Sequence, residues 1–281
     1  MDFRTLISAD ELRAQLAAPD LVIFDCRHDL MNPDAGAQAY AHGHIPGARF
    51  AHSDTDLAGP KTGRTGRHPL PDPAVFMTWL GRNGVDAGRQ VVAYDHAGGA
   101  SATRLWWMLR HWLGHERAAV LDGGWEAWVR AGGPVTAELP RIAAASFSGA
   151  PRPAWVDVDY VRAHLNHPDV TLIDARSPER YRGETEPIDP VAGHIPGARN
   201  RLYKENLDAS GRFKPAAALR AEFTALLDAK RPGQIVHQCG SGVSACHNIL
   251  AMEIAGLTGS KLYPGSWSEW CADPSRPVAR G

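Results

Sequence analysis

Residues 234–257 read QIVHQCGSGVSACHNILAMEIAGL, and the order of patterns within them indicates the architecture. A short apolar run leads into a glycine-rich segment, CGSGVS, and then into a helical pattern that ends at Gly256. A buried strand, a tight turn and a helix in this order are typical of a parallel sheet covered by helices. The carboxyl ends of such strands bind ligands, so we expect Cys239 at a ligand-binding edge.

The chain contains two copies of the same pattern. LVIFDCR (21–27), AHGHIPGAR (41–49), QVVAYD (90–95) and LDGGWEAW (121–128) return as TLIDAR (171–176), VAGHIPGAR (191–199), QIVHQC (234–239) and YPGSWSEW (263–270). Four matches in one order indicate a tandem duplication. We therefore predict an α/β protein with two tandem domains, each with a central, mostly parallel sheet flanked by helices.

Local signals refine this division. SADE at residues 8–11 predicts a helix capping box, Asp157 is expected to cap a helix, and Ser266 is expected to cap the last one. The segment 137–154 is rich in Pro, Ala and Ser and lacks apolar periodicity, as linkers do. We predict a first domain over residues 1–138, a linker over 139–154 and a catalytic domain over 155–281.

Composition excludes several functional classes. The net charge is −1 and the pI about 6.9, and basic residues are scattered, which argues against nucleic acid or a membrane surface as partner. The sequence has neither a signal-peptide pattern at its start nor an apolar run near 20 residues, so a cytoplasmic protein is expected. Its four cysteines form no C-x2-C pair, which favours free thiols over a metal site.

Cys239 lies on a turn suited to an anion. The amides of the next residues can point inward at the start of a helix, where the helix dipole adds positive potential. A thiol at such a point ionises readily. The loop residues expected to supply these amides and to contact substrate are Gly240, Ser241, Gly242, Val243 and Ser244.

Three other readings of the loop fit less well. A cysteine phosphatase needs arginine six residues after the nucleophile, and Ala245 stands there. The lysine of a Walker loop is missing. The dinucleotide fingerprint wants an acidic residue at the end of a second strand, which KLYPGS (261–266) does not offer. In the first half Asp95 replaces Cys239, so that half is interpreted as inactive.

The motifs GHIPGA (twice), CGSGVSA and LYPGSWSEW together resemble the two-domain rhodanese and 3-mercaptopyruvate sulfurtransferase family, over nearly the whole chain. The resemblance implies two rhodanese-like domains and a persulfide at Cys239. That persulfide would carry sulfur from 3-mercaptopyruvate or thiosulfate to a thiol, a thioredoxin-like protein or cyanide, without a cofactor. The alternative function is a persulfide carrier without turnover, or an anion-binding module, that serves a partner protein.

The resemblance also implies a Ser-His-Asp relay and an anion-binding arginine. Ser241 and His68 match the first two relay positions, and Asp56 the third, with Asp54 as a second candidate. Asp56 and His68 would otherwise only cap local structure. Arg180 matches the donor-binding arginine, but Asp189 stands where mercaptopyruvate enzymes have a second one. Arg182 is the proposed substitute, and the alternative is that Arg182 is an ordinary solvated arginine. The uncharged loop favours mercaptopyruvate, whereas the single arginine favours thiosulfate; we expect mercaptopyruvate to be preferred.

The remaining candidates are expected to be structural. Cys26, Cys246 and Cys271 are interpreted as inert thiols. His44 and His194 occur in both halves, including the inactive one, and are therefore interpreted as hydrogen bonders of the fold. Trp125, Trp128, Trp267 and Trp270 recur in the same way and are expected to pack in the core.

Overall fold

A computed structural model describes residues 2–281, which divide into two compact units. Unit 1 contains residues 2–59, 70–152 and 209–212, and unit 2 contains residues 60–69, 153–208 and 213–281. The segment 60–69 therefore belongs to unit 2, although it lies between elements of unit 1 in the sequence. Residues 137–152 form neither helix nor strand, and they bond along unit 1, for example from Ala145 N–H to the Gly81 carbonyl.

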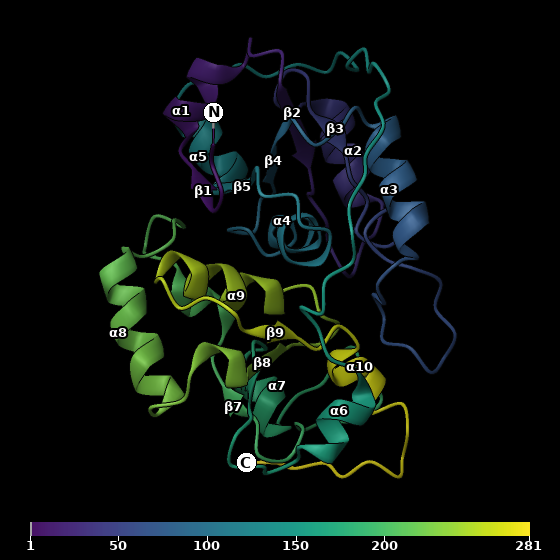
Figure 1. Ribbon diagram of the computed structural model, residues 1–281, viewed down its shortest axis with the longest axis vertical. Coiled ribbons are helices and arrows are strands. Elements are labelled where there is room, and N and C mark those ends of the chain that lie inside the picture. Colours follow the sequence, from purple (N-terminus) through teal and green to yellow (C-terminus); the bar gives the residue numbers. More distant parts are fainter. Residues whose placement is uncertain (1) are drawn as a thin grey trace. The chain divides into compact units, whose positions relative to one another are not determined.

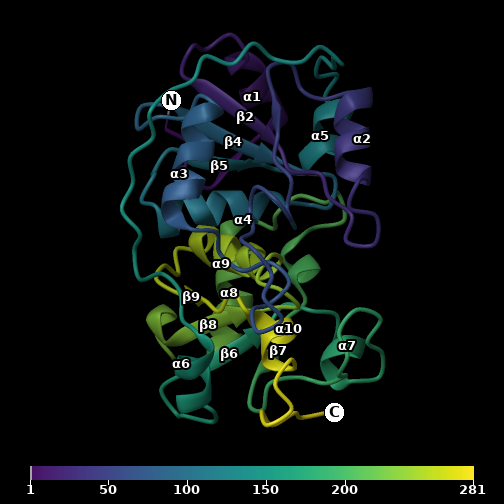
Figure 2. The same ribbon diagram turned by 90° about the vertical axis from the view of Figure 1, so that its right-hand side faces the viewer.

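Unit 1 is a five-stranded parallel sheet in the order β1-β5-β4-β2-β3, with helices on both faces (Figures 1 and 2). Helices α1 and α5 cover one face, and α3 and α4 pack toward the other. The strands are β1 (Leu6–Ile7), β2 (Leu21–Asp25), β3 (Arg49–Phe50), β4 (Gln90–Tyr94) and β5 (Ala118–Leu121). The helices are α1 (Ala9–Gln15), α2 (Ala35–His42), α3 (Pro73–Arg82), α4 (Ala102–Trp107), the π-helical η1 (Met108–Trp112) and α5 (Gly124–Arg130).

Unit 2 repeats this plan with a four-stranded parallel sheet in the order β7-β6-β8-β9. Helices α6 and α10 pack on one face, and α8 and α9 lie on the other (Figure 1). The strands are β6 (Thr171–Asp174), β7 (Arg199–Asn200), β8 (Ile235–Gln238) and β9 (Lys261–Leu262). The helices are α6 (Val158–Ala163), α7 (Pro178–Arg182), α8 (Ala216–Leu227), α9 (Ala245–Ile254), α10 (Ser266–Trp270) and the 3-10 turns η2 (Tyr203–Asn206) and η3 (Pro232–Gln234).

The predicted fold class is confirmed: both sheets are parallel and helices flank each of them. Local caps agree as well. Ser8 and Glu11 form the capping box, and the Asp157 carboxylate accepts from Tyr160 N–H. Helix α9 stops before Gly256, whose φ of +72° suits glycine. Within residues 2–281, no helix combines the length and the apolar character needed to cross a membrane.

The repeated GHIPGA motifs make the same contacts in both units. The ring of His44 stacks on Tyr40, with 3.9 Å between centroids, and its Nδ1 bonds the Tyr40 carbonyl at 2.7 Å. In unit 2 the ring of His194 stacks on Tyr181 at 3.8 Å, and its Nδ1 bonds the Tyr181 carbonyl at 2.8 Å. Both histidines are buried, so they act as hydrogen bonders inside the fold.

A buried ion pair is also duplicated. Asp25 at the end of β2 accepts from the side chain of Arg27 at 2.6 Å, and Arg27 reaches the Gly43 carbonyl and lies over the Trp125 ring. In unit 2, Asp174 and Arg176 form the same pair at 2.7 Å, and Arg176 reaches the Gly193 carbonyl and lies over Trp267. Each pair joins the end of a strand to the GHIPGA turn, and its hydrogen bonds offset the burial of charge.

The change Asp25→Asn should destabilise unit 1 by about 3 kcal/mol or more, because it leaves the buried Arg27 guanidinium without its counter-charge. The matched control is Asp10→Asn, which breaks an exposed pair with Arg13 and should cost less than about 1 kcal/mol. Urea unfolding followed by hydrogen exchange of the β4 amides measures both values. Equal effects of the two substitutions would contradict a role for the buried pair.

Candidate active site

Cys239 lies directly after β8, a strand with neighbours on both sides, and α9 begins six residues later at Ala245. The sequence predicted this strand, turn and helix. The side chain is buried, with 2% of its surface exposed. Cys239 is thus at the carboxyl end of a central parallel strand, the edge at which such sheets bind ligands.

The backbone of Cys239 is fixed by the N-terminal end of α10. Trp267 N–H donates to the Cys239 carbonyl at 3.0 Å, and Ser268 N–H donates to the Gly240 carbonyl at 2.9 Å. Cys239 N–H donates to the Ser266 hydroxyl at 3.1 Å, and that hydroxyl donates to the Tyr263 carbonyl. These bonds fix the start of the cysteine loop against the start of α10.

Ser266 was expected to cap α10, and this expectation is wrong. The cap position is Gly265, and Ser266 is the first helical residue, with its hydroxyl turned toward Cys239. Its φ of +54° is left-handed, a costly conformation for a residue with a side chain. The equivalent residue of unit 1 is Gly124, with a φ of +56°. Unit 2 therefore keeps the strained conformation and gains a hydroxyl at the cysteine.

The Cys239 sulfur lies 3.1 Å from the Gly242 nitrogen, whose N–H points at it. Gly242 has a φ of +78°, and a Cβ there would collide with the backbone of Pro264. Glycine is therefore required at position 242 for both conformation and space. A backbone N–H directed at the sulfur can donate a hydrogen bond to a negatively charged group at this point.

The matching loop of unit 1 shows what this geometry can hold. The Asp95 carboxylate accepts four backbone N–H bonds, from Ala97 at 2.8 Å, Gly99 at 2.9 Å, Ser101 at 2.7 Å and Ala102 at 2.8 Å. Asp95 is itself 1% exposed, so these amides replace its water. In unit 1 the loop after the central strand is therefore an anion cradle that its own side chain fills.

His68 and Ser241 are brought together within unit 2. A hydrogen bond of 2.7 Å joins His68 Nδ1 to Ser241 Oγ, and both residues are buried. Ser241 is two residues after Cys239, so this bond connects the cysteine loop to the segment 60–69. That pairing can hold a proton next to the cysteine.

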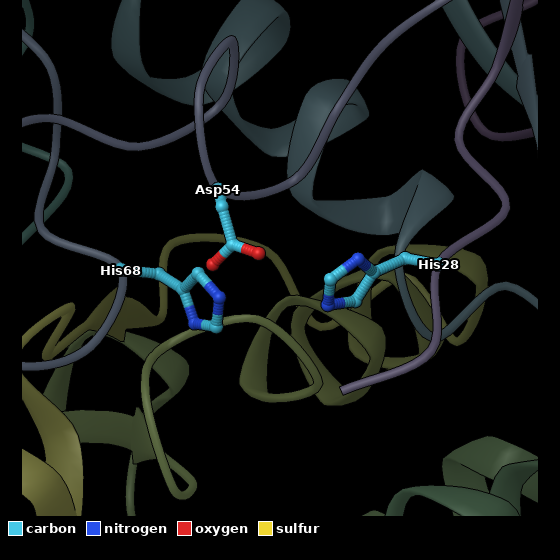
Figure 3. Close-up of side chains that lie close together, drawn as sticks. All are labelled: His28, Asp54 and His68. Carbon is cyan, nitrogen blue, oxygen red and sulfur yellow. The ribbon is translucent and has the colours of Figure 1, made fainter. Parts of the chain in front are cut away.

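The two acidic candidates for the relay lie in unit 1. The Asp56 carboxylate accepts from the His52 N–H at 2.8 Å, and burial raises its pKa. A carboxylate oxygen of Asp54 lies within 4.8 Å of a ring nitrogen of His28, and Figure 3 shows these two side chains with His68. The part of either acid in a relay stays a prediction.

Arg180 lies in a buried group of charges. Its guanidinium donates to Glu186 at 2.7 Å and 3.2 Å, and to Asp189 at 3.2 Å. The Asp189 carboxylate also accepts from Arg67, a residue that the sequence analysis did not select. Burial opposes ionisation of Glu186, but bonds from Arg180 and from the amides of Asp189 and Ile188 lower its pKa.

Arg182 does not belong to this group. Its side chain is 40% exposed and pairs with the exposed Glu184 at 2.6 Å. The structure does not support the suggestion that Arg182 supplies a second cation, because α7 turns Arg180 toward the buried carboxylates and leaves Arg182 at the surface. The other arginine that contacts Asp189 is Arg67. The sequence feature that could have identified Arg67 as a site residue is its position directly before His68. Nothing in the sequence indicated Glu186.

The three cysteines other than Cys239 are buried as well. All four cysteines are free. Burial raises the pKa of Cys26 well above its ordinary value and that of Cys271 to about 11. Cys246 is buried in α9 with its sulfur 3.4 Å from the Gly242 carbonyl. Trp128, Trp267 and Trp270 are fully buried, as expected of core residues, whereas Trp125 is only partly buried.

Comparison with known proteins agrees with this geometry. The rhodanese-like domain model matches residues 8–131 and again residues 157–273. A Pseudomonas aeruginosa protein named probable 3-mercaptopyruvate sulfurtransferase is 46% identical over 284 residues, which cover all of both chains. SseB of Mycobacterium tuberculosis, for which thiosulfate sulfurtransferase activity is proposed, is 39% identical and covers 99% of this chain and 98% of its own.

A solved structure has the same fold. The crystal structure of SseA from Escherichia coli, described as a 3-mercaptopyruvate sulfotransferase with the rhodanese fold, superimposes with a TM-score of 0.82. It is 31% identical, and the match covers 95% of this chain and all of SseA. The chain thus belongs to the two-domain rhodanese and 3-mercaptopyruvate sulfurtransferase family and is a sulfurtransferase.

Proposed function

We propose that the protein transfers a sulfane sulfur from 3-mercaptopyruvate, and more slowly from thiosulfate, through a persulfide on Cys239 to a thiol or cyanide. One observation carries this proposal: the Cys239 sulfur receives the Gly242 N–H at the carboxyl end of a central strand. The equivalent loop of unit 1 gives four N–H bonds to an anion. Cys239 therefore has the surroundings of an activated nucleophile.

The covalent structure of a persulfide fits such a cradle. In Asp95 the charged oxygens are two bonds beyond Cβ, and the outer sulfur of a Cys239 persulfide would also be two bonds beyond Cβ. The outer sulfur carries the negative charge, as the Asp95 oxygens do. Amides arranged around this point stabilise the persulfide anion, which is the species that must survive between donor and acceptor.

With mercaptopyruvate, the Cys239 thiolate attacks the donor sulfur and forms an S–S bond. The C–S bond of the donor breaks, and its electron pair passes to carbon as the enolate of pyruvate. That carbon takes one proton to become a methyl group. With thiosulfate, the S–S bond of the donor breaks and its electron pair leaves with sulfite, which needs no proton on carbon.

The second half of the reaction restores the thiolate. Cyanide or a thiolate attacks the outer sulfur, a bond to that sulfur forms, and the S–S bond returns its electron pair to Cys239. Thiocyanate or an acceptor persulfide leaves. A thioredoxin-like protein is one thiol acceptor of this class.

The Ser241–His68 pair is proposed as the route for the proton that mercaptopyruvate needs. Their hydrogen bond of 2.7 Å joins His68 to the cysteine loop. Arg180 is proposed to bind the donor anion, with the amides of Gly240, Val243 and Ser244 completing the cradle around the transferred sulfur.

Unit 1 is proposed as a support domain, since Asp95 cannot form a persulfide, and unit 2 as the catalytic domain. The proposal gives these two roles to the domains predicted at residues 1–138 and 155–281. A cytoplasmic location stays a prediction from the sequence.

Intact mass spectrometry tests the persulfide. The wild-type protein, treated with mercaptopyruvate or thiosulfate, should gain the mass of one sulfur atom and lose it on addition of cyanide. Cys239→Ser should gain nothing, and its turnover should fall by about 10⁴-fold or more because the nucleophile is gone. Cys246→Ser, the matched control, should load sulfur normally. Loading without turnover would favour a carrier that serves a partner protein.

The proton route predicts a difference between donors. Ser241→Ala should lower kcat for mercaptopyruvate by about 10²-fold, the usual contribution of a positioned acid or base. It should leave kcat for thiosulfate close to wild type, because sulfite departs unprotonated. Parallel assays of the two donors measure this. An equal loss with both donors would show that Ser241 only shapes the loop.

The same assay identifies the acid. Of Asp54→Asn and Asp56→Asn, the variant that reproduces the donor-dependent loss of Ser241→Ala marks the residue that orients His68. Asp56 is the sequence prediction. If neither variant affects mercaptopyruvate turnover, a three-residue relay is wrong.

A further inference from the structure

Arg67 is held at the cysteine loop by two contacts within unit 2. Its backbone N–H donates to the Ser268 hydroxyl at 3.0 Å, and its Nη1 donates to the Asp189 carboxylate. The Asp189 side chain is only 3% exposed, whereas that of Arg67 is 21% exposed. Asp189 is therefore a buried anchor, and the side chain that it holds is partly exposed.

The rest of the Arg67 guanidinium faces the loop. Its Nη2 would lie 2.8 Å from a Cβ placed on Gly240, the residue after the nucleophile. Its Nε is buried and has no hydrogen-bond partner among residues 2–281. Nε and Nη2 form one edge of the guanidinium, and two parallel N–H groups on that edge match the two oxygens of a carboxylate.

Arg180 approaches the same point. Both of its terminal nitrogens would lie 3.7 Å from a Cβ on Gly240, so two guanidinium groups lie beside one glycine. The φ of Gly240 is not positive, and the atoms nearest to a Cβ there are the ends of these two arginine side chains. A side chain at position 240 would occupy the volume that the arginines border.

We propose that Arg67 is the second cation of the donor site and binds the carboxylate of the sulfur donor together with Arg180, while Asp189 holds Arg67 in position. This inference rests on the proposed sulfur transfer. It removes the conflict between the uncharged loop and the missing arginine at position 189, because the second arginine comes from the segment 60–69.

The charges of the group favour one class of donor. Arg67 and Arg180 are balanced by the carboxylates of Asp189 and Glu186, so the site has directed N–H groups rather than a surplus of positive charge. A planar monocarboxylate is bound mainly by such directed pairs. The dianion thiosulfate would gain more from net positive charge. Small α-keto acids with a β-thiol are therefore the donors that the site fits.

The test compares Arg67→Gln and Arg67→Lys with Arg182→Gln, an exposed arginine in an ion pair of its own. For mercaptopyruvate, Arg67→Gln should raise KM about 10- to 100-fold, the effect of losing charge-assisted hydrogen bonds, with a smaller change in kcat. Arg67→Lys should raise KM less than Arg67→Gln does, because lysine keeps the positive charge but lacks the two parallel N–H groups of the guanidinium. Arg182→Gln should match wild type.

A donor without a carboxylate, 1-mercaptopropan-2-one, separates binding from folding. Arg67→Gln should use this neutral donor as well as wild type does, since no carboxylate is present to lose a partner. An unchanged KM for mercaptopyruvate, or an equal loss with the neutral donor, would overturn the role of Arg67. Failure of the wild-type protein to load sulfur from any donor would instead overturn the proposed function.

Discussion

Backbone N–H groups at the carboxyl end of a central parallel strand are the feature on which this molecule depends. In unit 1 four of them hold the Asp95 carboxylate, and in unit 2 the Gly242 N–H meets the Cys239 sulfur. Such groups have fixed directions because the strand and the following helix hold both ends of the loop. Because these N–H groups are fixed, they stabilise a negative charge that is buried away from water.

The duplication shows which parts of the fold are structural and which are chemical. Both units keep the buried aspartate–arginine pair after the first long strand and the histidine stacked on tyrosine. They differ at the loop. In unit 1 the Asp95 carboxylate fills the loop, and Gly124 is the first residue of α5. In unit 2 the corresponding residues are Cys239 and a strained Ser266, whose hydroxyl accepts from the Cys239 N–H. The local cost of that strain is thus confined to the unit with the thiol.

Much of the fold could be predicted from sequence because its signals are local or repeated. The capping box at Ser8, the cap at Asp157 and the end of α9 before Gly256 depend only on neighbouring residues. The parallel sheets follow from alternating strand and helix patterns, and the repeat required two of them. Ser266 was assigned wrongly because a serine before a short helix is usually a cap, and only the packing of α10 against Cys239 turns its hydroxyl elsewhere.

The sequence by itself indicated Cys239 as the nucleophile, because a cysteine on a glycine-rich turn between a strand and a helix fits that role better than the phosphatase, Walker or dinucleotide readings. It also determined the architecture and the family. The tertiary structure decided which charges surround that cysteine. Arg67 is 172 residues before Cys239, and its carboxylate partner Asp189 lies on another loop, so no local pattern connects them. Long arginine side chains reach several alternative partners, and only folding selects Arg67 and leaves Arg182 at the surface.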